Sequence, residues 1–369
     1  MRIQRHSHLL RNVALSAAGA GTLVLGGAAA WLTYSSLVAD RRRPLRPAID
    51  AERRTMKTSL GQAMSYYVDY RSGGRPLVLL HSINAAASAY EMKPLFDAYA
   101  GRRPVYAPDL PGFGFSDRVG APFTRELYLS SVIDMLTRVR DQWGPADVVA
   151  LSLTSEIAAI AALLRRDLVH SLTLISPTGL SSVLDDGHAP DRLARAGKSN
   201  RVERVLGDPR FAHAAQALFT ALVSRPSISY FLRKSFVGPA DPGLVAYAYD
   251  TAHQPNARFA PLAFVSGKLF TPDVRESVYL GLRVPVLVLY DEDPYVGFET
   301  LPALVERNPR WSAVRIGPSR GMPHFERPDE TTAALDVFFH QPHAASSVAP
   351  DAPDAPDASP LVTESSDRN

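Results

Sequence analysis

Residues 148–158 read Val-Val-Ala-Leu-Ser-Leu-Thr-Ser-Glu-Ile-Ala, and this stretch decides the fold. A short apolar, β-prone run stops at Ser152 and an alanine-rich helical pattern begins at once, so the sequence predicts a strand, a sharp turn and a helix. At such a turn the serine hydroxyl stands clear of the sheet, and the first N–H groups of the helix point toward whatever bonds to it. We therefore predict that Ser152 is a nucleophile.

The residues two before and two after the serine should be small, because the strand and the helix approach closely at this turn. Ala150 and Thr154 occupy these positions. Alanine is a mild departure from the usual glycine, and a β-branched threonine is a larger one. From this stretch alone, a second interpretation stays open: Ser152 only caps a helix, since serine is a preferred N-cap residue.

Apolar, strand-like runs alternate with helical patterns on both sides of Ser152. The expected strands are 63–70, 77–80, 104–108, 171–176 and 284–290, and the expected helices are 85–100, 124–143 and the segment that follows the serine turn to 166. This alternation is typical of a mostly parallel sheet covered by helices on both faces, so we predict an α/β fold. From 177 to 283 the alternation stops, and the pattern is irregular, helix-leaning and rich in aromatic residues.

Composition narrows the function classes. The chain has 369 residues, 46% of them hydrophobic, and a formal charge of +3. Its arginines are scattered, so we predict no nucleic-acid partner. The chain has no cysteine, which excludes disulfides, thiolate catalysis and cysteine-based zinc sites. We expect a small-molecule substrate and no cofactor, and the composition leaves the oligomeric state open.

The N-terminal region contains a long uncharged segment. Residues 12–39 carry no charge, are rich in Ala, Gly, Leu and Val, and are numerous enough to span a bilayer. We predict a single-pass membrane anchor, which makes the membrane a partner. Cleavage as a signal segment followed by export, and burial as a soluble helix, remain alternatives. Arginines flank the segment on both sides, so the side of the membrane on which the domain lies is left open.

The remaining composition shifts predict the domain organisation. The expected parts are a basic N-terminus at 1–11, the apolar segment at 12–39, a polar linker at 40–59, a globular domain at 60–340 and a tail at 341–369. The tail consists of Ala-Pro-Asp repeats followed by Ser and Glu. Such a composition cannot bury a core, and we expect the tail to be disordered.

Three motifs in the same order resemble those of the α/β-hydrolase family, over about residues 60–339. Residues 79–82, Leu-Leu-His-Ser, resemble the His-Gly oxyanion loop with serine in the glycine position. Residues 109–117, Asp-Leu-Pro-Gly-Phe-Gly-Phe-Ser-Asp, resemble the segment Asp-x-Pro-Gly-x-Gly-x-Ser, and the turn at Ser152 is the third motif. The resemblance implies the α/β-hydrolase fold, with residues 177–283 as a helical lid over an apolar pocket. A serine at the turn, where dehalogenases and epoxide hydrolases carry aspartate, favours ester, amide, thioester or carbon–carbon hydrolysis.

The resemblance also implies a catalytic acid and two oxyanion donors. The family places its acid after the strand predicted at 284–290, which indicates Asp293, with Asp291 as the alternative if the loop register differs. A solvated acidic turn would give the same residues. The backbone N–H groups of Ile83 and Leu153 would hold the oxyanion.

The general base is the difficult assignment. Residues 320–328 read Arg-Gly-Met-Pro-His-Phe-Glu-Arg-Pro, where the family usually has Gly-His-x-Pro-x-x-Glu-x-Pro. Aligned on the two prolines, the histidine position falls on Gly321. The only histidine of the segment is His324, and we predict that it is the base if the loop brings its ring to Ser152. The other interpretation is that His324 faces the following helix and takes no part in catalysis.

Two functions follow from these assignments. In the first, Ser152, His324 and Asp293 hydrolyse a small or lipophilic ester-type substrate through an acyl-enzyme. In the second, the chain is a ligand-binding or scaffold protein of the same fold, in which chemistry was lost with the histidine at position 321. The sequence does not distinguish the substrate within the ester class.

Overall fold

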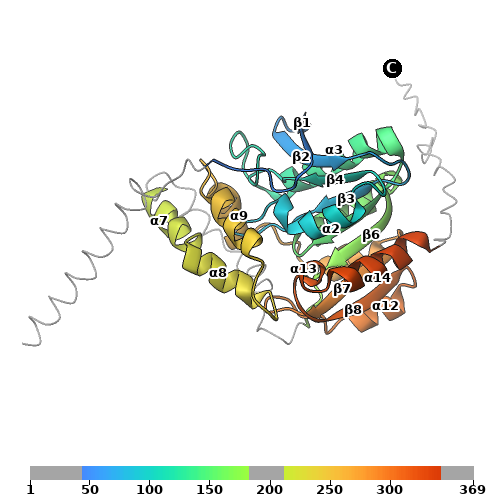
Figure 1. Ribbon diagram of the computed structural model, residues 1–369. Coiled ribbons are helices and arrows are strands. Elements are labelled where there is room, and N and C mark those ends of the chain that lie inside the picture. The colour runs from blue at the N-terminus through green and yellow to red at the C-terminus, as the bar shows by residue number, and fades with distance from the viewer. Residues whose placement is uncertain (1–43, 183–211, 342–369) are drawn as a thin grey trace, which may run out of the picture.

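The computed structural model describes residues 44–182 and 212–341, and these form one twisted sheet of eight strands in the order β1-β2-β4-β3-β5-β6-β7-β8 (Figure 1). The strands are β1 (Glu52–Lys57), β2 (Ala63–Asp69), β3 (Leu77–Leu80), β4 (Val105–Pro108), β5 (Ala146–Leu151), β6 (Val169–Ile175), β7 (Val286–Glu292) and β8 (Trp311–Arg320). Strand β2 pairs antiparallel with β1 and β4, and all other pairs are parallel. The predicted mostly parallel α/β sheet is confirmed.

The α-helices are α2 (Lys93–Tyr99), α3 (Arg125–Trp143), α4 (Thr154–Leu164), α7 (Ala212–Leu222), α8 (Arg225–Lys234), α9 (Pro242–Ala252), α10 (Phe259–Val265), α11 (Val274–Ser277), α12 (Leu301–Arg307), α13 (Pro323–Glu326) and α14 (Pro328–His340). Short 3₁₀ turns are η2 (Ala89–Met92), η3 (Arg166–Leu168) and η5 (Tyr279–Gly281).

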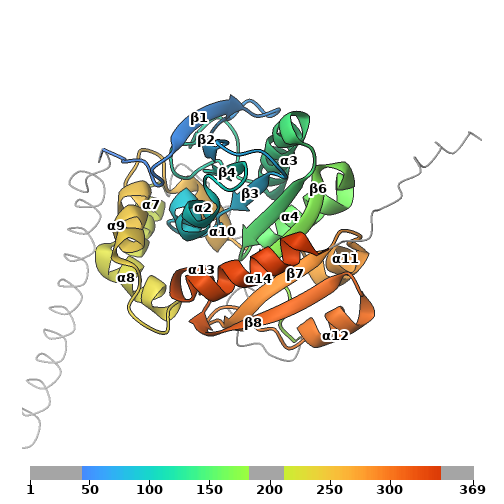
Figure 2. The same cartoon turned by 45° about the vertical axis from the view of Figure 1, so that its right-hand side comes forward.

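The sheet is buried on both faces because successive side chains of a strand point to opposite sides. In β5, Val148 and Ala150 belong to the apolar cluster that contains residues of α3 and α4. Val149 and Leu151 belong to the second cluster, with residues of α2 and α14. Figure 2 shows α2 and α14 in front of the sheet. The continuous apolar run before Ser152 therefore fills two cores at once, which holds the end of β5 rigidly.

A helical insertion lies between β6 and β7, as predicted. It contains α7, α8, α9, α10 and α11, of which α7, α8 and α9 stand beside the sheet (Figure 2). Phe219, Val223 and Ile228 form the centre of a small apolar cluster within it. The aromatic side chain of Phe219 therefore packs in the core of the insertion itself.

The folded domain begins earlier than residue 60. The predicted linker at 40–59 contains β1, which pairs with β2 along its whole length, and the buried residues Ala48 and Ile49. Strand β1 is an edge strand with mostly exposed, charged side chains, so its sequence resembles that of a linker. Backbone pairing rather than apolar burial specifies this strand.

The predicted single-pass membrane anchor is not upheld and is withdrawn, together with the membrane as a partner. Within residues 44–182 and 212–341, no helix is both long and apolar enough to cross a bilayer. The segment 12–39 lies outside the described residues, as does the predicted tail beyond residue 341.

Candidate active site

Ser152 lies at the sharp turn between β5 and α4. Its backbone has φ of 55°, a left-handed conformation that is strained for a residue other than glycine. Its N–H donates to the Ile175 carbonyl oxygen of the neighbouring strand at 2.9 Å, and its carbonyl oxygen accepts from Ser155 N–H at 3.0 Å. The turn therefore holds Ser152 at the carboxyl end of the central strand, where its side chain is partly exposed.

Thr154 fits this turn because its hydroxyl has a specific acceptor. The side chain is fully buried, and its Oγ1 donates to the His81 carbonyl oxygen at 2.7 Å. A glycine in this position could not make that bond. The departure from the small-residue pattern thus connects the start of α4 to the loop that carries Ile83.

The two predicted oxyanion donors lie on the elements that meet at this turn. Leu153 is the N-cap of α4, and Ile83 is a buried residue in the loop after β3. Neither backbone N–H has a hydrogen-bond acceptor among the described residues. Both amides therefore lack an acceptor within the described part of the chain.

His81 fixes the start of the loop that carries Ile83. The ring is buried, and burial lowers its pKa to about 4, so it is neutral at pH 7. Nε2 accepts from Leu110 N–H at 2.9 Å, which places the proton on Nδ1, and Nδ1 lies 2.6 Å from the Ser82 carbonyl oxygen. His81 is thus a structural bridge to residues 109–117, the segment that the sequence singled out.

Asp293 lies in the loop after β7, and its carboxylate is directed at residue 321. Oδ1 accepts from the N–H groups of Tyr295 at 2.7 Å and Val296 at 3.2 Å. Oδ2 lies 2.8 Å from the position that a Cβ atom on Gly321 would take. The carboxylate therefore faces the place where the family motif carries histidine, while Gly321 itself has φ of 82° and no side chain.

His324 is not hydrogen-bonded to Ser152 or Asp293. Its ring is fully buried, and Nε2 donates to the Glu91 carbonyl oxygen at 2.7 Å. Nδ1 is buried without a hydrogen-bond partner among the described residues, and burial lowers the pKa of the ring to about 4. In this arrangement the unprotonated nitrogen, Nδ1, makes no hydrogen bond to Ser152, which is the contact that a general base needs.

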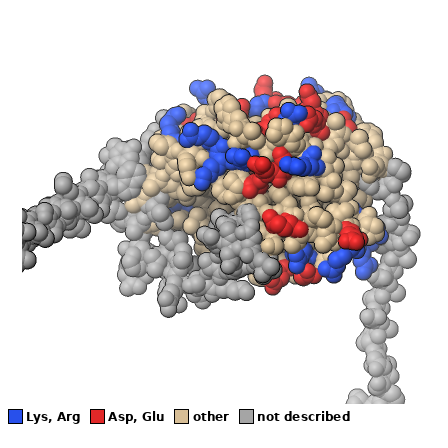
Figure 3. Space-filling view, turned by 90° about the horizontal axis from the view of Figure 1, so that it is seen from below, with Lys and Arg blue, Asp and Glu red and all other residues tan. Residues whose placement is uncertain are grey.

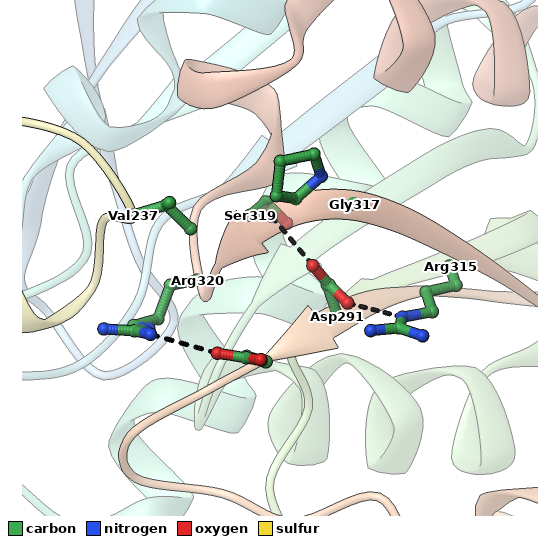
Figure 4. A pocket seen from close by; sticks show the side chains of 8 residues that line it. Val237, Asp291, Arg315, Gly317, Ser319 and Arg320 are labelled. Carbon is green, nitrogen blue, oxygen red and sulfur yellow. Dashed lines mark hydrogen bonds and ion pairs between the residues drawn. The ribbon is translucent and has the colours of Figure 1, made fainter.

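Asp291 is held in a different environment from Asp293. Its Oδ1 lies 2.5 Å from Arg315 Nε, and its Oδ2 accepts from Ser319 N–H at 2.8 Å. Burial raises its pKa, but these two contacts outweigh burial and leave the pKa below its ordinary value. Together with Arg320 and Glu292, these residues line a cavity of ≈ 510 Å³ at the ends of β7 and β8 (Figure 4). The contacts of Asp291 are those of a structural carboxylate.

Glu91 is a buried residue near the site that the sequence did not indicate. It lies in η2, is 2% exposed, and its carboxylate oxygens accept from Ser82 N–H and Asn84 Nδ2. A single glutamate at the start of an ordinary helical pattern carries no signal for such a role. Its contacts form only in the folded protein, where η2 packs against the loop that contains Ser82 and Asn84.

Known proteins are similar in sequence to the part of the chain that contains Ser152, Asp293 and His324. The sequence profile of the alpha/beta hydrolase family matches residues 77–335. The 2-hydroxymuconate semialdehyde hydrolase of Pseudomonas sp. (strain CF600) is 28% identical over 116 residues, which span 31% of this chain and 40% of that relative.

Solved structures of low identity share the fold. A membrane phospholipase A, described as a bacterial virulence factor, superposes with a TM-score of 0.60 at 20% identity and covers 90% of this chain and 98% of its own. A probable hydrolytic enzyme from Pseudomonas aeruginosa PAO1 gives a TM-score of 0.60 at 18% identity and covers 82% and 97%.

Proposed function

Because this chain belongs to the alpha/beta hydrolase family, we propose that it hydrolyses a small or lipophilic ester-type substrate with Ser152 as the nucleophile. The observation that carries the proposal is the turn itself. Ser152 is held at a positive φ between β5 and α4, directly before Leu153, and Thr154 bonds this turn to the loop that carries Ile83. Backbone strain of this kind is concentrated at functional sites.

The proposed first step forms an acyl-enzyme. Ser152 Oγ attacks the ester carbonyl carbon, the carbonyl electron pair moves onto oxygen, and the N–H groups of Ile83 and Leu153 hold the oxyanion. When the intermediate collapses, the carbon–oxygen bond to the alcohol breaks and the alcohol leaves with a proton. Water then attacks the acyl-enzyme, releases the acid and returns the proton to Ser152.

The proton of the Ser152 hydroxyl needs an acceptor. His324 would serve only if its unprotonated nitrogen, Nδ1, came within hydrogen-bond reach of Ser152, a contact that it does not make in the structure. We therefore propose that the proton reaches Asp293 through water, because Asp293 Oδ2 is directed at residue 321, the position at which the family motif carries its histidine. A carboxylate is a weaker base than an imidazole at neutral pH, so we expect slow turnover.

The hydrolase names of the relatives agree with this reaction class. The Pseudomonas relative is a semialdehyde hydrolase, and a structural neighbour is a phospholipase A. The choice between short and long acyl chains remains for experiment.

The test uses a fluorophosphonate probe and p-nitrophenyl esters of increasing chain length. We expect the probe to label the wild-type protein and not Ser152→Ala, and we expect slow ester turnover that added imidazole accelerates. Imidazole hydrolyses these esters by itself, so the rate with Ser152→Ala is the background to subtract. No labelling, and no turnover above that background with or without imidazole, would overturn the proposal.

A second function is favoured by one specific observation. Gly321 stands in the histidine position, and His324 is used to bind Glu91, so the chain could bind an acyl ligand without cleaving it. Retained binding of a fatty acid or ester by an unlabelled wild-type protein would support this ligand-binding function in place of hydrolysis.

A further inference from the structure

A buried hydrogen-bond network lies directly beneath the loop that carries Ile83. Glu91 Oε2 accepts from Ser82 N–H at 2.8 Å, and Oε1 accepts from Asn84 Nδ2 at 2.9 Å. Ser82 and Asn84 are the two neighbours of Ile83 in the chain. One carboxylate therefore fixes the residues on both sides of the predicted oxyanion donor.

Asn84 extends the network along the loop. Its Nδ2 also donates to Ser82 Oγ at 2.6 Å, and its Oδ1 accepts from Ala86 N–H at 2.8 Å. These bonds close the loop on itself around Ile83, so that the orientation of the Ile83 N–H depends on where the Glu91 carboxylate lies. Burial raises the pKa of Glu91, and the two donated bonds favour its ionised form.

The position of Glu91 is in turn set by His324. The imidazole Nε2 donates to the Glu91 main-chain carbonyl oxygen at 2.7 Å, and both residues are at most 2% exposed. The contact joins residues that are 233 positions apart in the sequence. It connects α13, the helix that follows Gly321, to the oxyanion loop.

We propose that Glu91 and His324 are positioning residues for the oxyanion site: His324 holds η2, and Glu91 holds the Ile83 N–H in the direction of the bound carbonyl oxygen. The inference rests on the proposed hydrolase function. It gives the displaced histidine a role through a hydrogen bond that it makes in the structure, in place of the role of base. The remaining donor, Leu153 N–H, is fixed independently by α4.

The first experiment separates positioning from proton transfer at His324. His324→Gln keeps a side-chain N–H that can donate to the Glu91 carbonyl oxygen, whereas His324→Leu removes it. We expect kcat for a p-nitrophenyl ester to stay within about threefold of wild type in His324→Gln and to fall about 10- to 100-fold in His324→Leu, a part of the effect known for loss of a whole oxyanion donor. If His324 is the base, both variants lose activity equally, and the positioning role is overturned.

The second experiment tests Glu91 itself. Glu91→Gln places an N–H₂ group opposite one of two donors, so the loop must shift. We expect kcat to fall about 10- to 100-fold with KM nearly unchanged, because the lost contact acts on the transition state. Affinity for an alkylboronic acid, which forms a tetrahedral adduct with serine, should fall in parallel, while affinity for the carboxylic acid product should not.

Controls make the outcomes separable. Glu306→Gln changes the same functional group on the exposed side of α12 and should leave kcat and boronate affinity unchanged. If Glu91→Gln does not fold, Asn84→Ala removes one partly exposed member of the network and should lower kcat in the same direction. If the Glu91 and Asn84 variants turn over substrate as fast as wild type and bind the boronic acid equally well, this inference alone is overturned. No labelling or turnover in the wild type overturns the proposed function and the inference together.

Discussion

At the scale of single residues, the site is defined by how neighbours hold Ser152. A positive φ in a residue other than glycine persists only where the surroundings fix it, and Thr154 supplies one such contact through its bond to the His81 carbonyl oxygen. The same carbonyl group belongs to the loop that presents Ile83. The turn at Ser152 and the loop that carries Ile83 are therefore connected by Thr154, a residue that departs from the small-residue pattern of the family turn.

Thr154→Val tests this connection. Valine has nearly the same shape but no hydroxyl, so the buried His81 carbonyl group loses its donor. We expect the free energy of unfolding in urea to fall by about 1–3 kcal/mol, the cost of an unsatisfied buried polar group. Thr154→Ser keeps the hydroxyl and should lose less. Equal stability of the valine variant and wild type would contradict the structural role of this bond.

The two aspartates after β7 should respond differently to replacement by asparagine. Asp293→Asn can still accept from Tyr295 N–H, so we expect the fold to remain while kcat falls about 10²- to 10⁴-fold, the range for loss of a proton acceptor.

Asp291→Asn should act on stability instead, because it weakens the contacts to Arg315 and Ser319. The folded-state pKa of Asp291 is depressed, so its contribution is present above the unfolded value of about 3.9 and is lost as the pH falls through the lower folded value. We expect the variant to differ from wild type at pH 7 and to converge with it in acid. Loss of turnover in Asp291→Asn, with Asp293→Asn active, would move the acid to Asp291.

At the scale of elements, a buried carboxyl group joins α4, the helix that follows Ser152, to the two ends of the insertion. Glu156 of α4 is 1% exposed; Thr178 Oγ1 donates to one of its oxygens, and Thr271 N–H donates to the other at 2.6 Å. Tyr279 then donates to the Thr178 carbonyl oxygen at 3.0 Å. Residues near the start and near the end of the helical insertion are thus fixed to the same helix.

Glu156 should make stability depend on pH. Burial raises its pKa to about 7, whereas the unfolded value is about 4.3, so the folded state binds more protons between these two values. Stability contributed by the protonated form is therefore present in acid and lost as the pH rises from about 4.3 through 7. Glu156→Gln stays neutral and keeps one acceptor for Thr271 N–H.

As the pH rises through this range, we expect the free energy of unfolding to decrease less in Glu156→Gln than in wild type. Urea denaturation at several pH values measures this difference. Glu306→Gln, at an exposed position of α12, is the matched control. Parallel pH profiles of wild type and Glu156→Gln would contradict a raised pKa at this position.

The elements that could be predicted from the sequence are those whose burial leaves an apolar pattern. Strands β3, β5 and β7 consist mainly of buried residues and were predicted from continuous apolar runs. The edge strands β1 and β8 were not predicted, because most side chains of β1 and half of those of β8 are exposed, and the pattern does not differ from that of a loop. Edge strands are specified by backbone pairing with a neighbour, which a local pattern does not record.

The candidate site residues differ in the same respect, since some follow from a local pattern and others depend on long-range packing. The position of Ser152 follows from a local strand-to-helix pattern, and Asp293 follows from its place after a strand. The direction of His324 depends on Glu91, which is 233 positions away. Contacts of that range are decided by packing, and so the base was the assignment that the sequence could not make.

At the scale of the whole molecule, most charged side chains lie on the surface and most apolar side chains fill the core. Figure 3 shows that Lys and Arg occur together with Asp and Glu, in small groups of each sign, over the described part of one face. The apolar side chains fill the two clusters on either side of the sheet, and α14 closes one of them near the C-terminal end of the described chain.

The position at which the folded domain ends can be tested by truncation. Phe338 and Phe339 in the last turn of α14 are 4% and 6% exposed, and the rings of Phe339 and Tyr99 lie 5.9 Å apart. Residues 342–369 have a composition that cannot build a core, so we propose that they add nothing to folding. A chain that stops after Gln341 should therefore melt within about 2 °C of wild type.

A chain that stops after Val337 is the matched comparison, since it differs by only a few more residues but removes both phenylalanines. Loss of a buried phenylalanine side chain costs about 3–5 kcal/mol, and a domain is stable by about 5–15 kcal/mol in total, so we expect this chain to be largely unfolded. Circular dichroism during heating measures both outcomes. A large drop in melting temperature for the chain ending at Gln341 would show that residues beyond the described domain stabilise it, and a stable chain ending at Val337 would show that α14 does not close the core.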